Sequence, residues 1–235
     1  MKVLRPALFL ALLCNPGSVR PLASGAHRDD TLVSAGMTES LASALARLQQ
    51  RYAGVQAVSA RFQQVYRAPG LEQVESGFFL MKKPGLMRWE YREPEVKLFI
   101  ADGRNTYLYT PEDRQVLVRA VDAHELLSTP LRFLLGQGDV TKDFSASWER
   151  EFKPRAEETV LIRLVPRSAD SDYEYVVLEC DAKTFDLRRI LVREPSGNYS
   201  EFTLTELTTN VRIDSKQFRF EIPKGVEVIH VDDKQ

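Results

Sequence analysis

The three histidines are the first residues to consider for acid–base or metal chemistry. They are His27, His124 and His230, and they lie far apart in the chain. None of them shares with a Cys, Asp or Glu the short spacing that is typical of zinc ligands. The sequence therefore predicts no metal site and no bound cofactor.

A charge-relay set could in principle be drawn from Asp122, His124 and Ser128, which lie close in sequence. The chain lacks the Gly-x-Ser-x-Gly turn that exposes a hydrolase nucleophile. We therefore expect no catalytic residue and no enzyme. A hydrolase that uses His124 is kept as an alternative, which ester turnover abolished by His124→Ala would support.

Two other local features have structural explanations. Gly136 and Gly138 resemble half of a phosphate-binding loop, but they follow a predicted helix and lack the further glycine and the lysine of such loops. Cys180 shares a strand face with Val176 and Leu178, which predicts a buried, unreactive side chain.

The N-terminus has the layout of a secretory signal peptide. Lys2 and Arg5 precede an apolar run from Ala7 to Leu13, and small residues end the segment at Ala26. The apolar run is about half the roughly 20 residues of a membrane span. We expect cleavage after residue 26 and export to the periplasm; the alternative is lipidation of Cys14.

The charge of the mature chain argues against a nucleic-acid partner. Removal of residues 1–26 takes away Lys2, Arg5 and Arg20 and no acid, so the formal net charge changes from −1 to −4. The remaining basic residues alternate with acidic ones, whereas polyanion binding needs a clustered basic surface. Residues 27–36 are predicted to form a flexible arm, and residues 37–235 a single, monomeric domain.

Hydrophobic periodicity predicts one helix followed by many strands. Leu41, Leu45, Leu48 and Tyr52 recur at helical spacing before Gly54. A second, short helix is predicted after Thr129-Pro130, through Leu131, Phe133 and Leu134. Strands are predicted near residues 58–67, 72–82, 86–92, 96–101, 105–110, 114–120, 143–152, 158–165, 173–180, 185–193 and 198–210. The expected class is mainly β: an antiparallel, unclosed half-barrel with the helices over its concave face.

Two strands carry unusual apolar patterns. Met87, Trp89 and Tyr91 alternate with polar residues and so point to one face. Residues 77–81 are apolar on both faces, so one face must pack against something besides the core of the sheet. That partner is either a second covering layer or a ligand.

Several motifs together resemble the outer-membrane lipoprotein carrier family LolA. They are FQQ at residues 62–64, KKPGLMRWEY at 82–91, Pro94, Asp102-Gly103, Tyr107 with Tyr109, Pro111, and FRFEIPKGVEV at 218–228. The resemblance runs through nearly the whole mature chain. It implies an eleven-stranded antiparallel half-barrel closed by helices.

The resemblance also implies a function and partners. It implies a periplasmic carrier that takes acylated lipoproteins from an ATP-driven inner-membrane lipoprotein-releasing complex to an outer-membrane acceptor. The alternative is a lipid-binding sensor or regulatory module of the cell envelope, which would bind a signalling partner instead of passing cargo on.

Predicted lipid-contact residues follow from this resemblance, although each of them could equally belong to an ordinary core. The predicted cavity lining is Leu45, Leu48, Tyr52, Phe62, Phe79, Met87, Trp89, Tyr91, Leu131, Phe133 and Leu134. Lys83 stands where the best-studied members of the family have an arginine that holds the lid helix. Because lysine offers fewer fixed donors than arginine, we predict weaker lid closure.

Overall fold

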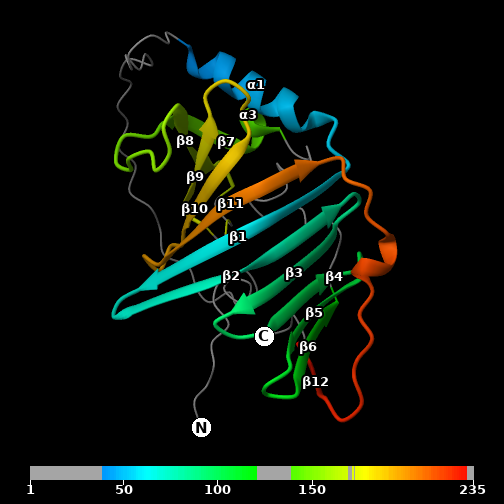
Figure 1. Ribbon diagram of the computed structural model, residues 1–235. Helices are drawn as coiled ribbons and strands as arrows, with labels where there is room; N and C mark the ends of the chain where they lie inside the picture. Colours follow the sequence, from blue (N-terminus) through cyan, green and yellow to red (C-terminus); the bar gives the residue numbers. More distant parts are fainter. Residues whose placement is uncertain (1–38, 121–138, 169–170, 172, 232–235) are drawn as a thin grey trace. The chain divides into compact units, whose positions relative to one another are not determined.

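The computed structural model describes residues 39–120, 139–168, 171 and 173–231 (Figure 1). These residues divide into two compact units. The first holds the described residues within Met1–Leu48, Tyr66–Glu72 and Asp139–Glu201. The second holds those within Gln49–Val65, Gln73–Gly138 and Phe202–Gln235. The predicted signal peptide, the predicted arm and the predicted second helix lie outside the described residues.

The described chain is mainly β. Its helices are α1 (Leu41–Ala53), α3 (Val140–Asp143) and the 3-10 helix η2 (Ser215–Phe218). Its strands are β1 (Ala57–Ala68), β2 (Leu71–Lys82), β3 (Leu86–Glu93), β4 (Lys97–Ala101), β5 (Asn105–Thr110), β6 (Gln115–Ala120), β7 (Phe144–Trp148), β8 (Thr159–Pro166), β9 (Tyr175–Asp181), β10 (Leu187–Arg193), β11 (Tyr199–Thr209) and β12 (Glu227–His230). The predicted first helix and all eleven predicted strands are confirmed.

The strands form one unclosed sheet in the order β12-β6-β5-β4-β3-β2-β1-β11-β10-β9-β8-β7. The prediction of an unclosed, antiparallel sheet of about eleven strands is confirmed, with one addition. A twelfth strand, β12, pairs with β6 in parallel, with Glu227 opposite Gln115 and His230 opposite Val118. The covering of a concave face by helices stays a prediction.

Helix α1 is amphipathic, as its sequence period requires. Leu45, Leu48 and Tyr52 are buried on one side of it. In the first unit, Arg47 extends from α1 so that its guanidinium lies 4.4 Å from the centroid of the Phe185 ring. The same guanidinium donates to the carbonyl of Lys183 at 2.5 Å. The middle of α1 is thereby fixed to the β9–β10 turn.

The strands β8, β9 and β10 of the first unit are buried on both faces. One face carries apolar side chains, six of which are at most 1% exposed: Ile162, Leu164, Val176, Leu178, Cys180 and Ile190. The other face combines the apolar cluster Leu161, Val177 and Leu191 with buried charges. These charges bind the segment 149–158, which covers that face.

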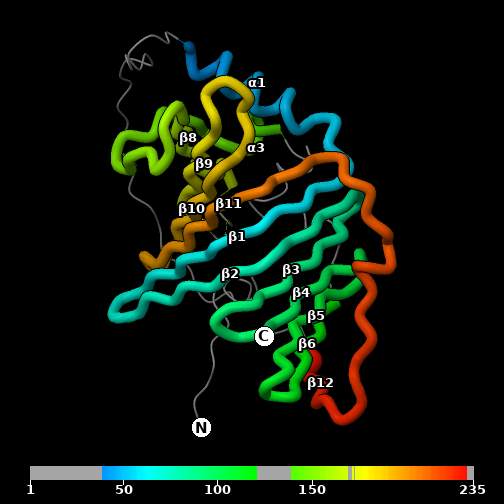
Figure 2. Tube along the Cα trace, viewed as in Figure 1, coloured from blue at the N-terminus to red at the C-terminus, as the bar shows by residue number. Residues whose placement is uncertain are grey.

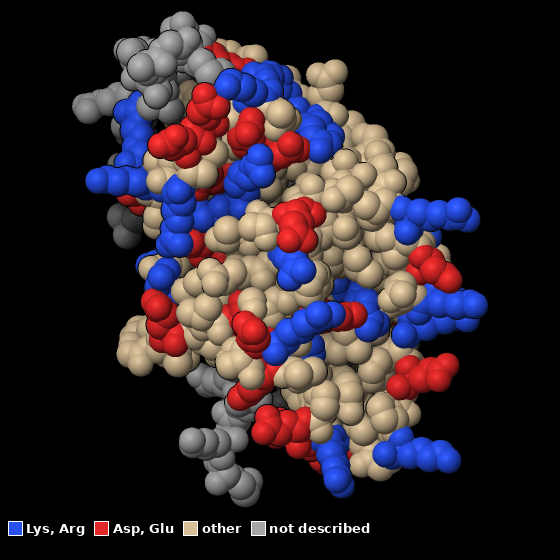
Figure 3. All heavy atoms as spheres, viewed as in Figure 1, with Lys and Arg blue, Asp and Glu red and all other residues tan. Residues whose placement is uncertain are grey.

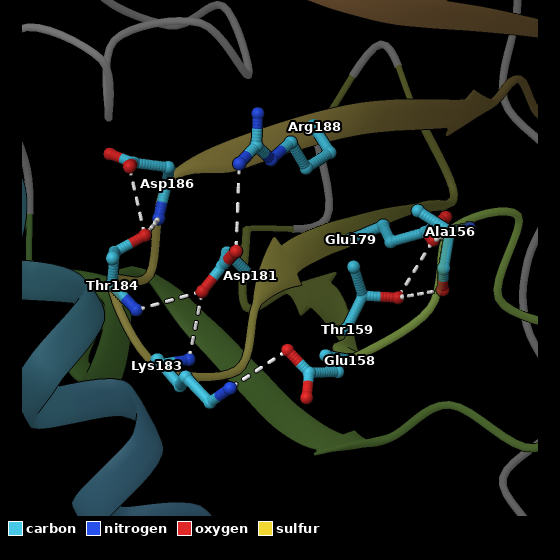
Figure 4. A network of polar contacts seen from close by, with 9 residues as sticks. All are labelled: Ala156, Glu158, Thr159, Glu179, Asp181, Lys183, Thr184, Asp186 and Arg188. Atoms are coloured by element: carbon cyan, nitrogen blue, oxygen red, sulfur yellow. Dashed lines mark hydrogen bonds and ion pairs between the residues drawn. The ribbon is translucent and has the colours of Figure 1, made fainter.

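Glu179 is the main attachment point of this covering segment (Figure 4). Its Oε1 accepts from the backbone amides of Arg155 and Ala156 at 2.9 and 3.1 Å, and from the hydroxyl of Thr159 at 2.9 Å. Its Oε2 accepts from Nε of Arg189 at 2.6 Å. A buried carboxylate with this many donors holds an irregular segment in place without leaving the charge unpaired.

In the second unit, the chain after β11 turns through η2 and returns along β6 as β12 (Figures 1 and 2). Nζ of Lys82 donates to the carbonyl of Ile213 at 2.9 Å, and Arg88 donates to the carbonyl of Gln217 at 3.0 Å. Farther along, the ring of Phe220 packs on Tyr107 and Tyr109, with centroids 5.3 and 5.6 Å apart. The C-terminal segment is therefore attached to β2, β3 and β5.

Phe78 lies on the outer face of residues 77–81, the segment that is apolar on both faces. Its ring lies between the guanidiniums of Arg61 and Arg92, each 4.3 Å from the ring centroid. Such contacts cover an aromatic ring on a sheet's outer side while the charges stay in water. On the second face of residues 77–81, Phe78 is thus covered by the protein's own side chains, and the first face is the candidate for binding.

Figure 3 shows acidic and basic side chains interspersed on the face that it draws. None of the helices in the described part of the chain combines the length and the apolar character that crossing a bilayer requires.

Candidate functional site

The second unit presents a continuous face of large apolar side chains. It is built from alternate residues of neighbouring strands, because successive side chains of a strand point to opposite sides. We call it the aromatic face; its members are Phe62 of β1, Phe79 and Met81 of β2, Met87, Trp89 and Tyr91 of β3, Phe99 of β4, and Phe202 of β11. The strand register places Phe79 and Phe99 directly opposite Trp89, and Met81 opposite Met87.

Trp89 is the centre of the aromatic face. Its ring stacks on Phe79 at a centroid distance of 4.8 Å and an interplanar angle of 17°. Phe62 and Phe202 meet it edge-on, at 4.8 and 5.7 Å. Each such aromatic pair stabilises the fold by about 0.5–1.5 kcal/mol in addition to the effect of burying its apolar surface. The methionines beside these rings are flexible and polarizable, so this end of the face can adapt to guests of different shape.

Gly77 allows the strands of this face to approach one another. A Cβ atom at this position would lie 1.8 Å from the backbone oxygen of Glu90 and 3.1 Å from the ring of Phe62. The β2–β3 register also shifts between Ser76 and Gly77. Only glycine fits here, because any side chain would displace β3 and the Phe62 ring.

A buried polar cluster lies at one end of the aromatic face. It consists of Gln64, Glu75, Tyr91 and Lys97, each at most 5% exposed. The Tyr91 hydroxyl donates to Oε1 of Gln64 at 3.1 Å, and Nζ of Lys97 pairs with Oε1 of Glu75. The ammonium of Lys97 also lies 4.9 Å from the centroid of the Tyr91 ring.

The charges of this cluster compensate one another. Burial, and secondarily the nearby carboxylate of Glu75, raise the pKa of Tyr91 well above its ordinary value. The hydroxyl therefore stays protonated and acts as a donor toward Gln64. Because Lys97 and Glu75 neutralise each other, the cluster offers hydrogen-bonding groups without a net charge.

The structure brings together five of the predicted lipid-contact residues. Phe62, Phe79, Met87, Trp89 and Tyr91 are members of the aromatic face. Leu45 and Leu48 are buried on α1 within the first unit, and Tyr52 is buried in the second unit. Leu131, Phe133 and Leu134 lie outside the described residues. The contact of the whole set with lipid stays a prediction.

Sequence reasoning missed several members of this site. Met81 has the same strand parity as Phe79, and Phe99 is a large apolar residue within a predicted strand, so both carried a usable signal. Gln64 and Glu75 carried none, because a polar residue in a strand is ordinarily assigned to solvent.

Lys83 is half-buried, and its backbone amide donates to the carbonyl of Gln56 at 2.9 Å. Its predicted lid partner lies outside the described residues, so the predicted lid contact stays a prediction. The preceding Lys82 is the residue whose ammonium binds the C-terminal segment, at the carbonyl of Ile213 and the hydroxyl of Ser215.

The residues considered for catalysis do not form a site in the described chain. His27, Asp122, His124, Ser128, Gly136 and Gly138 lie outside it, and His230 is exposed on β12. Cys180 is fully buried, and burial raises the pKa of its thiol, which opposes reactivity. Within residues 39–120, 139–168, 171 and 173–231, no group of three or more His, Cys, Asp or Glu side chains could hold a metal ion.

Comparison with known families identifies the relatives of this chain. The family described as outer membrane lipoprotein carrier protein LolA matches residues 53–221. The chain belongs to this family. Residues 53–221 include every strand that contributes to the aromatic face.

Individual LolA relatives are similar over most of their length. The outer-membrane lipoprotein carrier protein of Cupriavidus pinatubonensis is 29% identical over 201 residues, which cover 83% of this chain and 92% of the relative. That of Pseudomonas aeruginosa is 29% identical over 232 residues, covering 97% and 99%. A solved LolA superfamily protein from Nitrosomonas europaea has a TM-score of 0.40 at 14% identity, covering 76% of this chain and 97% of that one.

Proposed function

We propose that this protein is a periplasmic carrier that binds the acyl chains of lipoproteins along its aromatic face and moves them from the inner to the outer membrane. The observation that carries the proposal is the coincidence of two features. The residues matched by the carrier family include every strand that builds the aromatic face, and that face consists of aromatic and methionine side chains.

The energetics of acyl chains explain why such a carrier is needed. Each buried CH₂ contributes about 0.8 kcal/mol, so transfer of one chain of about 16 carbons into water costs roughly 12 kcal/mol. Unassisted passage through the periplasm is therefore too slow. A carrier surrounds the acyl chain with apolar side chains in place of the bilayer. Flexible residues such as Met81 and Met87 keep the binding weak enough for the chain to be released.

The proposed partners lie at the two membranes. Loading takes place at the ATP-driven inner-membrane complex that releases lipoproteins, and unloading at an outer-membrane acceptor, with the carrier acting as a monomer without enzymatic activity. The N-terminal pattern of residues 1–26 supports export, and the family relatives named as lipoprotein carriers support the class of cargo.

Tryptophan fluorescence tests binding at the aromatic face. The chain has two tryptophans, Trp89 and Trp148, so a Trp148→Phe variant reports on Trp89 alone. An acyl chain that enters among the rings must change the surroundings of Trp89, which is fully buried against three of them. We expect addition of a triacylated lipopeptide to shift the emission of this variant.

The matched control is Trp89→Phe, in which only Trp148 of β7 emits and no shift is expected. Unaltered Trp89 emission at saturating lipopeptide, from protein with an intact circular dichroism spectrum, would count against binding at this face. A carrier also passes bound lipopeptide to outer-membrane vesicles, whereas a sensor retains it.

A further inference from the structure

The Nε2 donor of Gln64, in the polar cluster, has no acceptor within the part of the chain that the structure describes. Nε2 of Gln64 is buried and finds no acceptor among the described residues, although Oε1 of the same amide accepts from Tyr91. Gln64 itself is fully buried. A buried donor without an acceptor is unfavourable, and in native proteins it usually has a functional reason.

Its neighbours hold this amide in a fixed direction. The protonated Tyr91 hydroxyl occupies Oε1, and Tyr91 is in turn held by the Phe62 ring, edge-on at a centroid distance of 5.1 Å, and by the Lys97 ammonium. A donor chain of this kind polarises the amide and strengthens the hydrogen bond that its NH₂ group can make. Gln64 is therefore oriented toward an acceptor that residues 39–120, 139–168, 171 and 173–231 do not supply.

The position of the cluster indicates where the rest of a ligand would lie. Along β3, the side chains on this face change from Tyr91 through Trp89 to Met87, and on β4 they change from Lys97 through Phe99 to Ala101. At about 3.3 Å per strand residue, this apolar track is about 13 Å long. A ligand that fits it has a hydrocarbon body and a polar acceptor at one end.

We propose that Gln64 donates a hydrogen bond from Nε2 to the carbonyl oxygen of an ester-linked acyl chain whose hydrocarbon lies along the aromatic face. This inference rests on the proposed function and specifies the chemical group that the carrier recognises. A neutral carbonyl suits the cluster better than a free carboxylate, because Lys97 is already neutralised by Glu75.

The test compares two lipopeptides that differ only at the linkage of the two glyceryl chains, dipalmitoyl ester against dihexadecyl ether. The ether lacks both carbonyl oxygens. One hydrogen bond of ordinary net strength predicts that the wild-type protein binds the ester about fivefold more tightly. Gln64→Leu is expected to lose this preference while binding the ether as the wild type does. Gln63→Leu, the exposed neighbour on β1, is the matched control and should keep it.

A spectroscopic measurement on the wild type covers the case in which Gln64→Leu does not fold. With a ¹³C-labelled ester carbonyl, the infrared stretch of the bound ligand should lie below its position in an alkane solvent. A dipalmitoyl phospholipid is the second probe. It is compared with its dihexadecyl ether counterpart. If the protein also prefers the ester form of the phospholipid, the inference is supported and free lipid is a source of the carbonyl. If the preference is seen only with the lipopeptide, the inference is supported and lipoproteins are the source.

Equal binding of ester and ether by the wild type, or an ester preference that survives Gln64→Leu, overturns this inference and leaves the carrier proposal standing. Failure of the wild type to bind either lipopeptide overturns both.

Discussion

Gly77 is the residue at which the aromatic face depends most on the absence of a side chain. In Gly77→Ala the new Cβ would lie 1.8 Å from the Glu90 carbonyl oxygen, and backbone cannot move aside as a flexible side chain can. We expect a loss of about 3 kcal/mol or more in the free energy of unfolding, measured by urea denaturation.

The control for this substitution is Gly54→Ala. A Cβ at Gly54 meets nothing within 4 Å, and its backbone does not have a positive φ angle. This variant should be as stable as the wild type or more stable by up to about 1 kcal/mol, because alanine restricts the unfolded chain. Equal stabilities of the two variants would show that β2 and β3 are farther apart than described.

The buried pair Glu75–Lys97 gives a second prediction at this scale. Lys97→Met leaves the Glu75 carboxylate buried without its cation, which should destabilise the protein by about 3–5 kcal/mol. Adding Glu75→Leu to the same protein removes the stranded charge and should restore most of the loss. Urea denaturation measures the free energy of unfolding of both variants. A double variant that is less stable than Lys97→Met would contradict a direct pairing of Glu75 with Lys97.

Among the elements, the segment 149–158 has little regular structure of its own and depends on Glu179. Glu179→Gln keeps the size of the side chain but removes the charge that Arg189 and two backbone amides share. We expect a loss of about 3 kcal/mol in stability and faster proteolytic cleavage within this segment, read by mass spectrometry of the fragments.

Glu158→Gln is the matched control for this element, because Glu158 pairs with Lys183 in an exposed position (Figure 4). Exposed pairs contribute little, so stability and cleavage should match the wild type. Cleavage at wild-type rate in Glu179→Gln would mean that other contacts attach the segment.

Most elements could be predicted from the sequence, because alternation and turn residues are local signals. β12 was missed since Glu227–His230 is short and largely exposed, and its pairing with β6 depends on how the C-terminal segment returns. α3 was missed because Val140–Asp143 is one turn long, capped by Asp139 and without a helical period.

The candidate site was predictable only in part. The period of β3 was sufficient to place Met87, Trp89 and Tyr91 on one face. Contacts across strands, such as that between Phe202 and Trp89, depend on strand order and register, which no local pattern specifies. The polar cluster is the extreme case, because burial of Gln64, Glu75 and Lys97 follows from the pairing of four strands.

For the whole molecule, the proposed function requires that the mature chain be exported and that it pick up lipid in the cell. Residues 1–26 predict processing to a mature N-terminus at His27. The family match and the aromatic face support acylated proteins as the cargo.

The most direct test of this claim is mass spectrometry of lipids and peptides extracted from the protein after purification from the periplasm of its own organism. We expect acylated N-terminal lipoprotein peptides to be bound to the wild type, and fewer of them to a Trp89→Asp variant that still folds. Wild-type protein that yields no acylated peptide, even when release to the outer membrane is blocked, would contradict it.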